Sequence, residues 1–417
     1  MRLLHTSDWH LGQTLHNFER GYEHQCFLDW LLDTIVAEQA DALLVAGDVF
    51  DNANPSAAAQ KQLYRFLQQA RQRAPGLDIV IIAGNHDSPG RIEAPAPLLE
   101  SHGTAVIGHV LRDGAGQIDL ERMLVPLHDA SGAVRAWCLA VPFLRPGDVP
   151  RAGEDGAAPA DQYLNGIALL YQQAYALAAA RRTPGQAIVA MGHCHMVDGQ
   201  ASLESERRIV IGGTEALPAA VFDPGLAYVA LGHLHLAQRV GQREQVRYCG
   251  SPLPLSFAEV GYRHQVLRVD LAGDGAAAVT ALPVPRAVEL LRVPARPAPL
   301  EQVLAELAAL APAPLPLHAQ PLLEVRVLLD APEPGLRARI EAALEGKPVR
   351  LAKIEPTRSQ QGEAGGAPAM SLDQLAQLQP DDIFRRLYQQ RFGGEAPADQ
   401  LSAFAELMLP AAGEPAP

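Results

Sequence analysis

Cysteine is scarce and thinly spread in this sequence. Four cysteines occur in 417 residues, and no two of them form a C-x-x-C pair. This pattern favours neither a disulfide framework nor a structural zinc site built from thiolates. We therefore expect four free thiols, at Cys26, Cys138, Cys194 and Cys249.

Long apolar runs are also missing. No stretch reaches the roughly 18 apolar residues that a membrane-spanning helix needs. The N-terminal stretch MRLLHT does not have the pattern of a signal peptide, because imidazole and acidic side chains interrupt it from His5 onwards. These absences predict a cytoplasmic protein that does not bind membranes.

An excess of positive charge is the third absence. The net charge is −13, which argues against a protein that grips nucleic acid through bulk positive charge. The charge is uneven, however, because residues 286–358 carry +1 and the rest of the chain carries −14. Any contact with DNA must then come from local patches, a bound metal or a partner.

The chain divides into regions that differ in composition and in the spacing of their apolar residues. Residues 1–285 alternate apolar runs with amphipathic stretches, which is typical of a layered α/β domain. Residues 286–356 read as strand, helix, strand, helix, strand, a smaller α/β domain. A linker is expected at 357–370, a pair of amphipathic helices at 371–409, and a disordered end at 410–417.

Four apolar runs within the first region each reach a glycine that is followed by a possible metal ligand. The runs are LLVAGD (43–48), IVIIAGNHD (79–87), AIVAMGH (187–193) and YVALGHLH (228–235). The stretch SDWHLG (7–12) adds an acid and an imidazole two residues apart, which point the same way on an extended chain. Binding crevices form beyond the carboxyl ends of strands. The candidate ligands are Asp8, His10, Asp48, Asn85, His193, His233 and His235.

The chemistry of this set indicates the kind of metal. Carboxylate, amide and imidazole groups without a thiolate suit octahedral divalent ions such as Mn(II) better than structural zinc. Seven ligands are too many for one ion. Two ions about 3.5 to 4 Å apart, bridged by one carboxylate, would use all of them.

The order of these motifs resembles that of a known family. D-x-H, GDVFD, GNHD, GH and GHLH look like the motifs of the calcineurin-like metallophosphoesterases, over residues 1 to about 285. SDWHLGQ, GDVFDNANP and RYCGSPLPLSF (247–257) look closer still to the SbcD family of bacterial nuclease subunits. The resemblance implies a layered β-sandwich core flanked by helices, with a smaller α/β capping domain and a C-terminal helical tail.

The resemblance also implies a role for each residue of the site. One metal would be held by Asp8, His10 and His235, and the other by Asn85, His193 and His233. Asp48 would bridge the two ions. His86 would contact the scissile phosphate and protonate the leaving oxygen, with Asp51 as its carboxylate partner.

The activity implied by the resemblance is metal-dependent cleavage of DNA in repair, recombination and replication. It comprises 3′ to 5′ exonuclease action on duplex ends and endonuclease action on hairpins and single strands. The implied partner is an SbcC-type ATPase with a coiled coil, in a heterotetramer with two nuclease subunits. Apolar positions at helical spacing in 371–409, such as Phe384 and Leu387, predict docking on that coiled coil or folding back on the chain itself.

Other interpretations remain open at this point. A phosphodiesterase for small molecules or a phosphoprotein phosphatase would use the same core chemistry. A scaffold that has lost its metals is disfavoured, because the ligand set is intact. His195, in GHCH, is either a ligand or a polar neighbour of the site, and His16 and Arg20 are candidates for contact with DNA phosphate.

Overall fold

The computed structural model describes residues 1–100, 103–150, 159–197, 199–200, 216–275, 278–331, 333–358 and 388. Met1–Arg358 forms one compact unit and Ser359–Pro417 a second. The predicted linker from residue 359, the predicted helix pair at 371–409 except Tyr388, and the predicted disordered end lie outside the described residues.

Two six-stranded sheets form the larger part of the first unit. The first sheet runs in the order β14 (Ala278–Pro283), β13 (Gln265–Asp270), β1 (Arg2–Thr6), β4 (Ala42–Ala46), β5 (Asp78–Ile82) and β6 (Thr104–Ile107). The second runs in the order β11 (Gln238–Val240), β12 (Arg243–Tyr248), β10 (Tyr228–Gly232), β9 (Ala187–His193), β8 (Val134–Ala140) and β7 (Leu124–His128). The central strands of both sheets are parallel, and the antiparallel pairings lie toward the edges.

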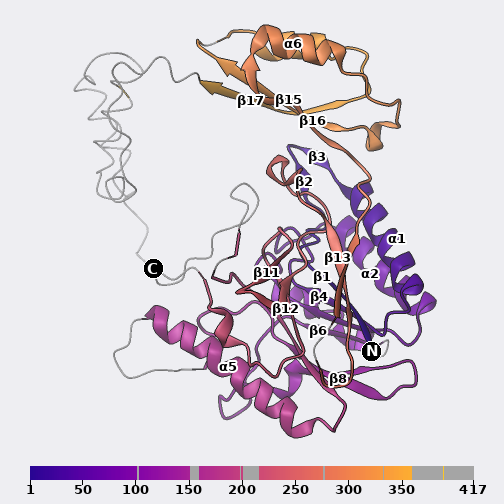
Figure 1. Ribbon diagram of the computed structural model, residues 1–417, viewed down its shortest axis with the longest axis vertical. Helices are drawn as coiled ribbons and strands as arrows, with labels where there is room; N and C mark the ends of the chain where they lie inside the picture. The colour runs from indigo at the N-terminus through magenta and orange to yellow at the C-terminus, as the bar shows by residue number, and fades with distance from the viewer. Residues whose placement is uncertain are drawn as a thin grey trace, which may run out of the picture. The chain divides into compact units, whose positions relative to one another are not determined.

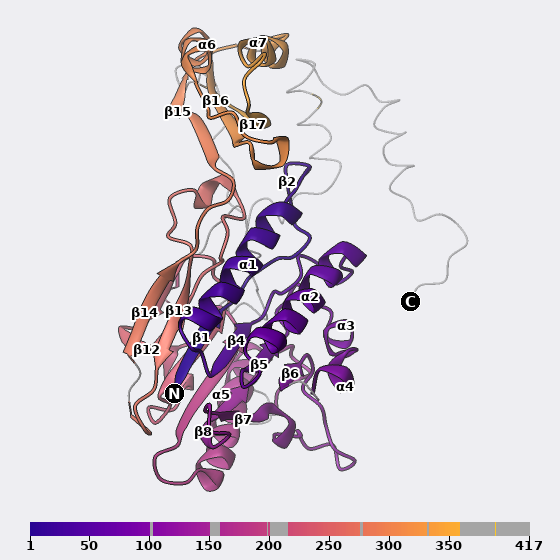
Figure 2. The same cartoon turned by 90° about the vertical axis from the view of Figure 1, so that its right-hand side faces the viewer.

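Helices cover the outer faces of these sheets. Helices α1 (Gly21–Ala37) and α2 (Ala57–Arg73) lie side by side over the first sheet (Figure 2). Helix α5 (Pro159–Arg181) packs against β8 and β9 of the second. One face of β4 shares a buried cluster with the second sheet, and its other face packs under α1 and α2. The result is a layered sandwich with a helical layer on each side.

Helix α2 shows how the sequence determines such a layer. Its N-cap, Ser56, accepts a hydrogen bond from the Ala59 amide at 3.2 Å. Leu63, Phe66 and Ala70 recur at helical spacing and are buried against the sheet. The exposed face is polar, so only one orientation of the helix buries its apolar surface.

Short elements connect the layers. Strands β2 (Thr14–Leu15) and β3 (Phe18–Glu19) pair as a hairpin after β1, and α3 (Pro89–Glu93) and α4 (Ala96–Leu99) follow β5. Short 3-10 helices occur at Glu121–Met123, Ala219–Val221, Phe257–Glu259 and Leu317–Ala319.

A third sheet has three parallel strands. These are β15 (Leu290–Pro299), β16 (Leu322–Leu329) and β17 (Arg350–Arg358), linked by α6 (Leu300–Ala309) and α7 (Leu336–Ala343). Helix α6 lies over one face of this sheet (Figure 1), where both helices bury a cluster that includes Val325 and Val327. The order of elements is the one expected from the sequence. The predicted boundary at residue 285 falls between β14 and β15.

The third sheet is joined to the sandwich by a separate hydrophobic cluster. Leu290 of β15 and Leu322 of β16 pack with Leu15 and Phe257. The mixed α/β sheets, with helices outside them, confirm the predicted fold class. Among the described residues, no helix has the length and apolar character needed to span a membrane.

Candidate metal centre

The candidate ligands lie at the carboxyl ends of five strands drawn from both large sheets. Strands β1, β4 and β5 of the first sheet lead to three of the motifs, and β9 and β10 of the second lead to the other two. The sandwich therefore brings the ends of two sheets to one place. It holds together Asp8, His10, Asp48, Asn85, His193, His233 and His235.

The backbone at these strand ends is unusual. Asp8, His10 and Asp48 have φ angles of 54°, 46° and 47°, in the left-handed region that few residues with a side chain occupy. Hydrogen bonds between the two loops hold them there, from the Asp8 amide to the Gly47 carbonyl at 3.0 Å and from the His10 amide to the Asp48 carbonyl at 3.1 Å. Such strain is characteristic of functional sites.

Close approach explains why a glycine precedes the ligand in these motifs. A Cβ atom on Gly84 would overlap the carboxylate of Asp48, and one on Gly47, whose φ is 88°, would overlap the ring of His193. Each glycine thus leaves room for a ligand that comes from another strand.

Trp9 occupies the position between the first two ligands and faces the opposite way. Its indole is fully buried under the helical layer, with edge contacts to Phe27 at 5.6 Å and Phe66 at 5.4 Å between ring centroids. Its Nε1 donates to Thr6 Oγ1 at 2.9 Å. Trp9 therefore anchors this loop in the core between Asp8 and His10, whose side chains face the site.

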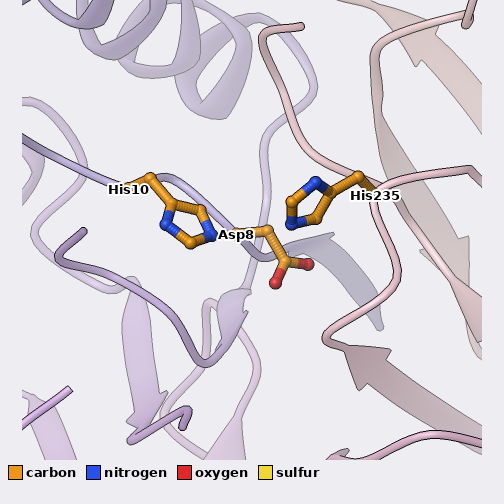
Figure 3. Close-up of side chains that lie close together, drawn as sticks. All are labelled: Asp8, His10 and His235. Atoms are coloured by element: carbon orange, nitrogen blue, oxygen red, sulfur yellow. The ribbon is translucent and has the colours of Figure 1, made fainter. Parts of the chain in front are cut away.

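One group of ligand atoms belongs to Asp8, His10 and His235. A side-chain oxygen or nitrogen from each lies within 4.8 Å of the others, and all three residues are buried. Figure 3 shows the two imidazoles on either side of the Asp8 carboxylate. Asp8 Oδ1 also accepts a hydrogen bond from the His233 amide at 3.0 Å.

A second group centres on Asn85. Its Oδ1 lies 2.9 Å from His193 Nε2 and 3.1 Å from His233 Nδ1. The other ring nitrogen of His193, Nδ1, lies 2.9 Å from the Ala46 carbonyl oxygen. Two imidazoles and an amide oxygen therefore converge on one point.

Asp48 lies between the two groups. Its Oδ2 is 3.6 Å from His10 Nε2 and 3.4 Å from His193 Nε2, while its Oδ1 accepts from the His86 amide at 2.8 Å. His10 Nε2 is buried and has no hydrogen-bond partner among the residues that the structure describes. A buried imidazole nitrogen facing carboxylates without a hydrogen bond fits a site for a cation.

The electrostatics of the centre also fit a cation. Burial would raise the pKa of the Asp48 carboxyl, but His193 and His10 outweigh it and hold that pKa below its usual range. Burial would lower the pKa of His193, but Asp48 outweighs it and raises the pKa to about 9. Because buried carboxylates require a positive partner, the protein attracts positive charge here, as a divalent metal would supply.

His86 lies beside the centre, and its contact with Asp51 differs from the predicted one. His86 Nδ1 lies 2.7 Å from the main-chain carbonyl oxygen of Asp51. A carbonyl oxygen can only accept, so Nδ1 carries the hydrogen in this hydrogen bond. The Asp51 carboxylate instead reaches His10, with Oδ1 3.3 Å from Nδ1. The turn conformation places the carbonyl rather than the carboxylate toward His86.

The remaining candidates have different environments. The ring of His195 is 6.1 Å from that of His233, and His195 is in none of the three His, Cys and acidic clusters found among the described residues. Arg20 is buried, with Nε and Nη2 on the Glu23 carboxylate and Nη1 on Gln13 and the Pro254 carbonyl. Arg20 therefore braces the fold, and its proposed contact with DNA is wrong. His16 is exposed and stacks on Phe257.

Two carboxylates that support the centre, those of Asp87 and Glu259, were not predicted from the sequence. Asp87, the last residue of GNHD, accepts hydrogen bonds from the amides of Val49, Phe50 and Gly84 at 2.9 to 3.1 Å and so joins two ligand loops. Burial, together with the nearby Asp48, raises the pKa of Asp87 to about 6. Glu259 Oε1 lies 2.9 Å from His235 Nδ1. No spacing rule links Glu259 to His235, or Asp87 to Val49 and Phe50.

A groove of about 490 Å³ opens beside the centre. His10, Asp51 and His86 line it. His16 of the β2–β3 hairpin and Lys353 of β17 contribute to its wall. The third sheet therefore takes part in forming the groove.

Comparison with known proteins agrees with this arrangement. Residues 1–237 match the family model of the calcineurin-like phosphoesterases, and residues 286–392 match that of the type 5 capsule protein repressor C-terminal domain. The chain is 43% identical over 388 residues to the SbcD component of the SbcCD nuclease of Rhodobacter capsulatus, covering 92% of this chain and 93% of that protein. It belongs to the SbcD family of metallophosphoesterases.

Other SbcD proteins show the same relationship. Identity to the SbcD component of the Escherichia coli K12 SbcCD nuclease is 35% over 391 residues, 93% of this chain and 92% of that protein. The Bacillus subtilis SbcD protein is 36% identical over 272 residues, covering 65% of this chain and 66% of that protein. Membership of the SbcD family confirms a metallophosphoesterase that hydrolyses phosphoesters with divalent metal.

Proposed function

We propose that this SbcD protein is a dinuclear metal-dependent DNA nuclease. The observation that carries the proposal is the position of Asp48, whose Oδ2 lies between His10 Nε2 and His193 Nε2. A carboxylate at that point is within reach of an ion in each half of the centre. Carboxylate, amide and imidazole ligands favour Mn(II).

Each half of the centre has its own ligands in this proposal. One ion would be held by Asp8, His10 and His235, the other by Asn85, His193 and His233, and Asp48 would contribute to both. When bound, two divalent ions supply an activated water and positive charge for the phosphate oxygens.

His86 is the proposed general acid. It lines the groove, and its ring centroid is 4.8 Å from that of His10. Nδ1 is held by the Asp51 carbonyl, and Nε2 is the atom proposed to contact the scissile phosphate and to protonate the leaving sugar oxygen. Asp51 positions both His86 and His10.

DNA is the substrate that the relatives and the groove support best. The relatives that match over most of this chain are named as nuclease subunits. Lys353 of the third sheet lines the same groove as His86 and is ion-paired with Glu324 and Glu355 at 3.2 and 3.4 Å; we propose that its positive charge lies along the path of the phosphate backbone. The proposed activities are 3′ to 5′ exonuclease action on duplex ends and endonuclease action on hairpins and single strands, in DNA repair.

The test compares two substrates. The pure chain is incubated with Mn(II) and either linear duplex DNA or a chromogenic phosphodiester, with and without an SbcC-type ATPase. Cleavage of DNA that requires Mn(II) and increases with the ATPase is the expected result. Cleavage of the small diester with no action on DNA under any condition would favour a small-molecule phosphodiesterase instead.

Lys353 provides a finer test of the groove. Lys353→Gln should lower the rate on duplex DNA several-fold while sparing hydrolysis of the small phosphodiester, because only the longer substrate reaches the third sheet. Lys347→Gln, which alters a lysine of the same domain that bonds the carbonyls of Ala308 and Leu310, is the matched control. Equal loss on both substrates for Lys353→Gln would contradict a steering role.

The partner is proposed to be an SbcC-type ATPase, in a heterotetramer with two nuclease subunits. The relatives carry the name of the SbcCD complex. Residues 371–409, which lie outside the described residues, are proposed to dock on the coiled coil through their apolar positions. Truncation after Gln360 should leave a metal-loaded phosphodiesterase that no longer co-purifies with the ATPase. Undiminished binding by the truncated chain would exclude the tail as the main docking site.

A further inference from the structure

The segment Cys249–Glu259 follows β12 and lies against the metal ligand His235. The Ser251 amide donates to the His235 carbonyl at 3.1 Å. Gly250 has a φ of 78°, and a Cβ atom there would lie 2.6 Å from the same carbonyl oxygen. This segment contains most of the motif RYCGSPLPLSF, yet it supplies none of the proposed ligands. Its close approach to His235 requires another explanation.

Glu259 closes the segment with a carboxylate behind the ring of His235. The side chain is fully buried, and its Oε1 lies 2.9 Å from His235 Nδ1. Its Oε2 accepts a hydrogen bond from the Leu255 amide at 2.7 Å. The carboxylate thus acts as an acceptor at both oxygens. His235 Nδ1 then carries the hydrogen, and the lone pair of Nε2 points to Asp8 and His10.

The segment is itself held in place by buried polar contacts. Arg20 donates to the Pro254 carbonyl at 2.6 Å, and Gln13 donates from Nε2 to the Leu255 carbonyl at 2.9 Å. Phe257 is buried in the cluster that joins the sandwich to the third sheet. Glu259 therefore has little freedom to leave His235.

We infer that Glu259 is a positioning residue that fixes the ring and tautomer of His235 for one of the two metal ions. The inference rests on the proposed dinuclear centre. A carboxylate behind a ligating histidine raises its basicity and orients it, and loss of such a partner typically costs about 10- to 100-fold in metal affinity. His193, in the other half, faces the Ala46 carbonyl instead. Loss of Glu259 should therefore lower the affinity for one ion and leave the affinity for the other unchanged.

Glu259→Gln in the full-length chain is the decisive variant. Glutamine has nearly the same shape but offers one acceptor oxygen where two donors, Leu255 N–H and His235 Nδ1–H, must be satisfied. If the amide group faces His235, Nδ1 must accept and Nε2 carries the hydrogen, which blocks metal binding. If it faces Leu255, the segment loses a hydrogen bond that holds it.

The measurement is Mn(II) titration of the metal-free protein by calorimetry, with the bound metal counted by mass spectrometry. Wild type should bind two ions. Glu259→Gln should bind one with an affinity reduced about 10- to 100-fold and the other within about twofold of wild type. Glu259→Asp, which keeps the charge but is one methylene shorter, should fall between them.

Glu93→Gln is the matched control. Glu93 Oε2 lies 2.9 Å from His109 Nδ1, so it forms a carboxylate–imidazole pair of the same length in which neither residue is a proposed ligand. This variant should bind both ions as wild type does. His235→Ala, which removes the ligand itself, should affect the same ion as Glu259→Gln.

Two outcomes would overturn the inference. Unchanged affinity for both ions in Glu259→Gln would show that Glu259 does not position the ligand. Equally reduced affinity for both ions, together with a lower Tm of the metal-free protein, would show that Glu259 stabilises the fold in general and does not position His235 specifically. If Glu259→Gln does not fold, the tautomer of His235 in metal-free wild type decides by nitrogen NMR: hydrogen on Nδ1 supports the inference, and hydrogen on Nε2 contradicts it. A wild type that binds fewer than two ions would refute the dinuclear proposal itself.

Discussion

The two halves of the proposed metal centre are built differently. In the half that contains Asp8, both imidazoles have a carboxylate behind them. Asp51 Oδ1 lies 3.3 Å from His10 Nδ1, and Glu259 Oε1 lies 2.9 Å from His235 Nδ1. Negative charge therefore accumulates on this side, both in the ligands and in the residues that support them.

The other half is closer to neutral. His193 Nδ1 faces the Ala46 carbonyl, and Asn85 contributes an amide oxygen where the first half has the Asp8 carboxylate. Because charge on ligands and their partners raises affinity for a divalent ion, the first half should bind its ion more tightly. Among the ligands proposed for the second half, the shared Asp48 is the one that carries a formal charge.

Removal of the shared ligand should have the largest effect. Asp48→Ala removes the carboxylate that is proposed to bridge the two ions, so both ions should be lost and cleavage abolished. Mass spectrometry of the purified variant checks the metal content. Two ions retained in Asp48→Ala would exclude a bridging role.

Ligand variants on either side should separate the halves. His10→Ala and His193→Ala should each retain one ion, and His10→Ala should abolish cleavage. His193→Ala keeps the more negative half, so its remaining Mn(II) should bind more tightly than that of His10→Ala. Calorimetric titration compares the Mn(II) affinities of the two variants. Tighter binding by His10→Ala would show that the half with Asp8 is not the tighter site.

His86 tests whether chemistry can be separated from metal binding. His86→Ala should keep both ions and lose about 100- to 10,000-fold in turnover, the range expected for a general acid. Single-turnover cleavage of DNA with Mn(II) at saturation measures the loss. A variant that loses a metal would assign His86 to the ligands instead.

His195 should give the smallest effect. It lies outside the two groups, and its ring is 6.1 Å from that of His233. His195→Ala should retain both ions and cleave DNA within a few-fold of wild type. Loss of a metal in this variant, with both ions kept in His193→Ala, would reverse the two assignments.

The repeated order of apolar run, glycine and ligand made the centre predictable. Gly47 and Gly84 are required because ligands from other strands occupy the space that a Cβ atom would fill. Convergence at the carboxyl ends of strands followed from general properties of parallel sheets. Which sheet each strand would join did not follow, because strands β9 and β10 have the same apolar character as β4 and β5.

The residues that support the ligands were harder to predict from sequence. Glu259 meets His235 only after the chain has passed through β11 and β12, so no local pattern joins them. For Asp51, residue type alone did not tell whether its carboxylate or its carbonyl would face His86. Arg20 was expected to be a basic group on a loop. It is instead buried, because it pairs with the Glu23 carboxylate one helical turn further on.

Anomalous diffraction from crystals of the full-length protein grown with Mn(II) would locate the ions themselves. Two manganese peaks per chain are expected. One should lie among Asp8, His10 and His235, the other among Asn85, His193 and His233, with Asp48 in contact with both. A single peak, or a second peak that Asp48 does not contact, would contradict a shared dinuclear centre.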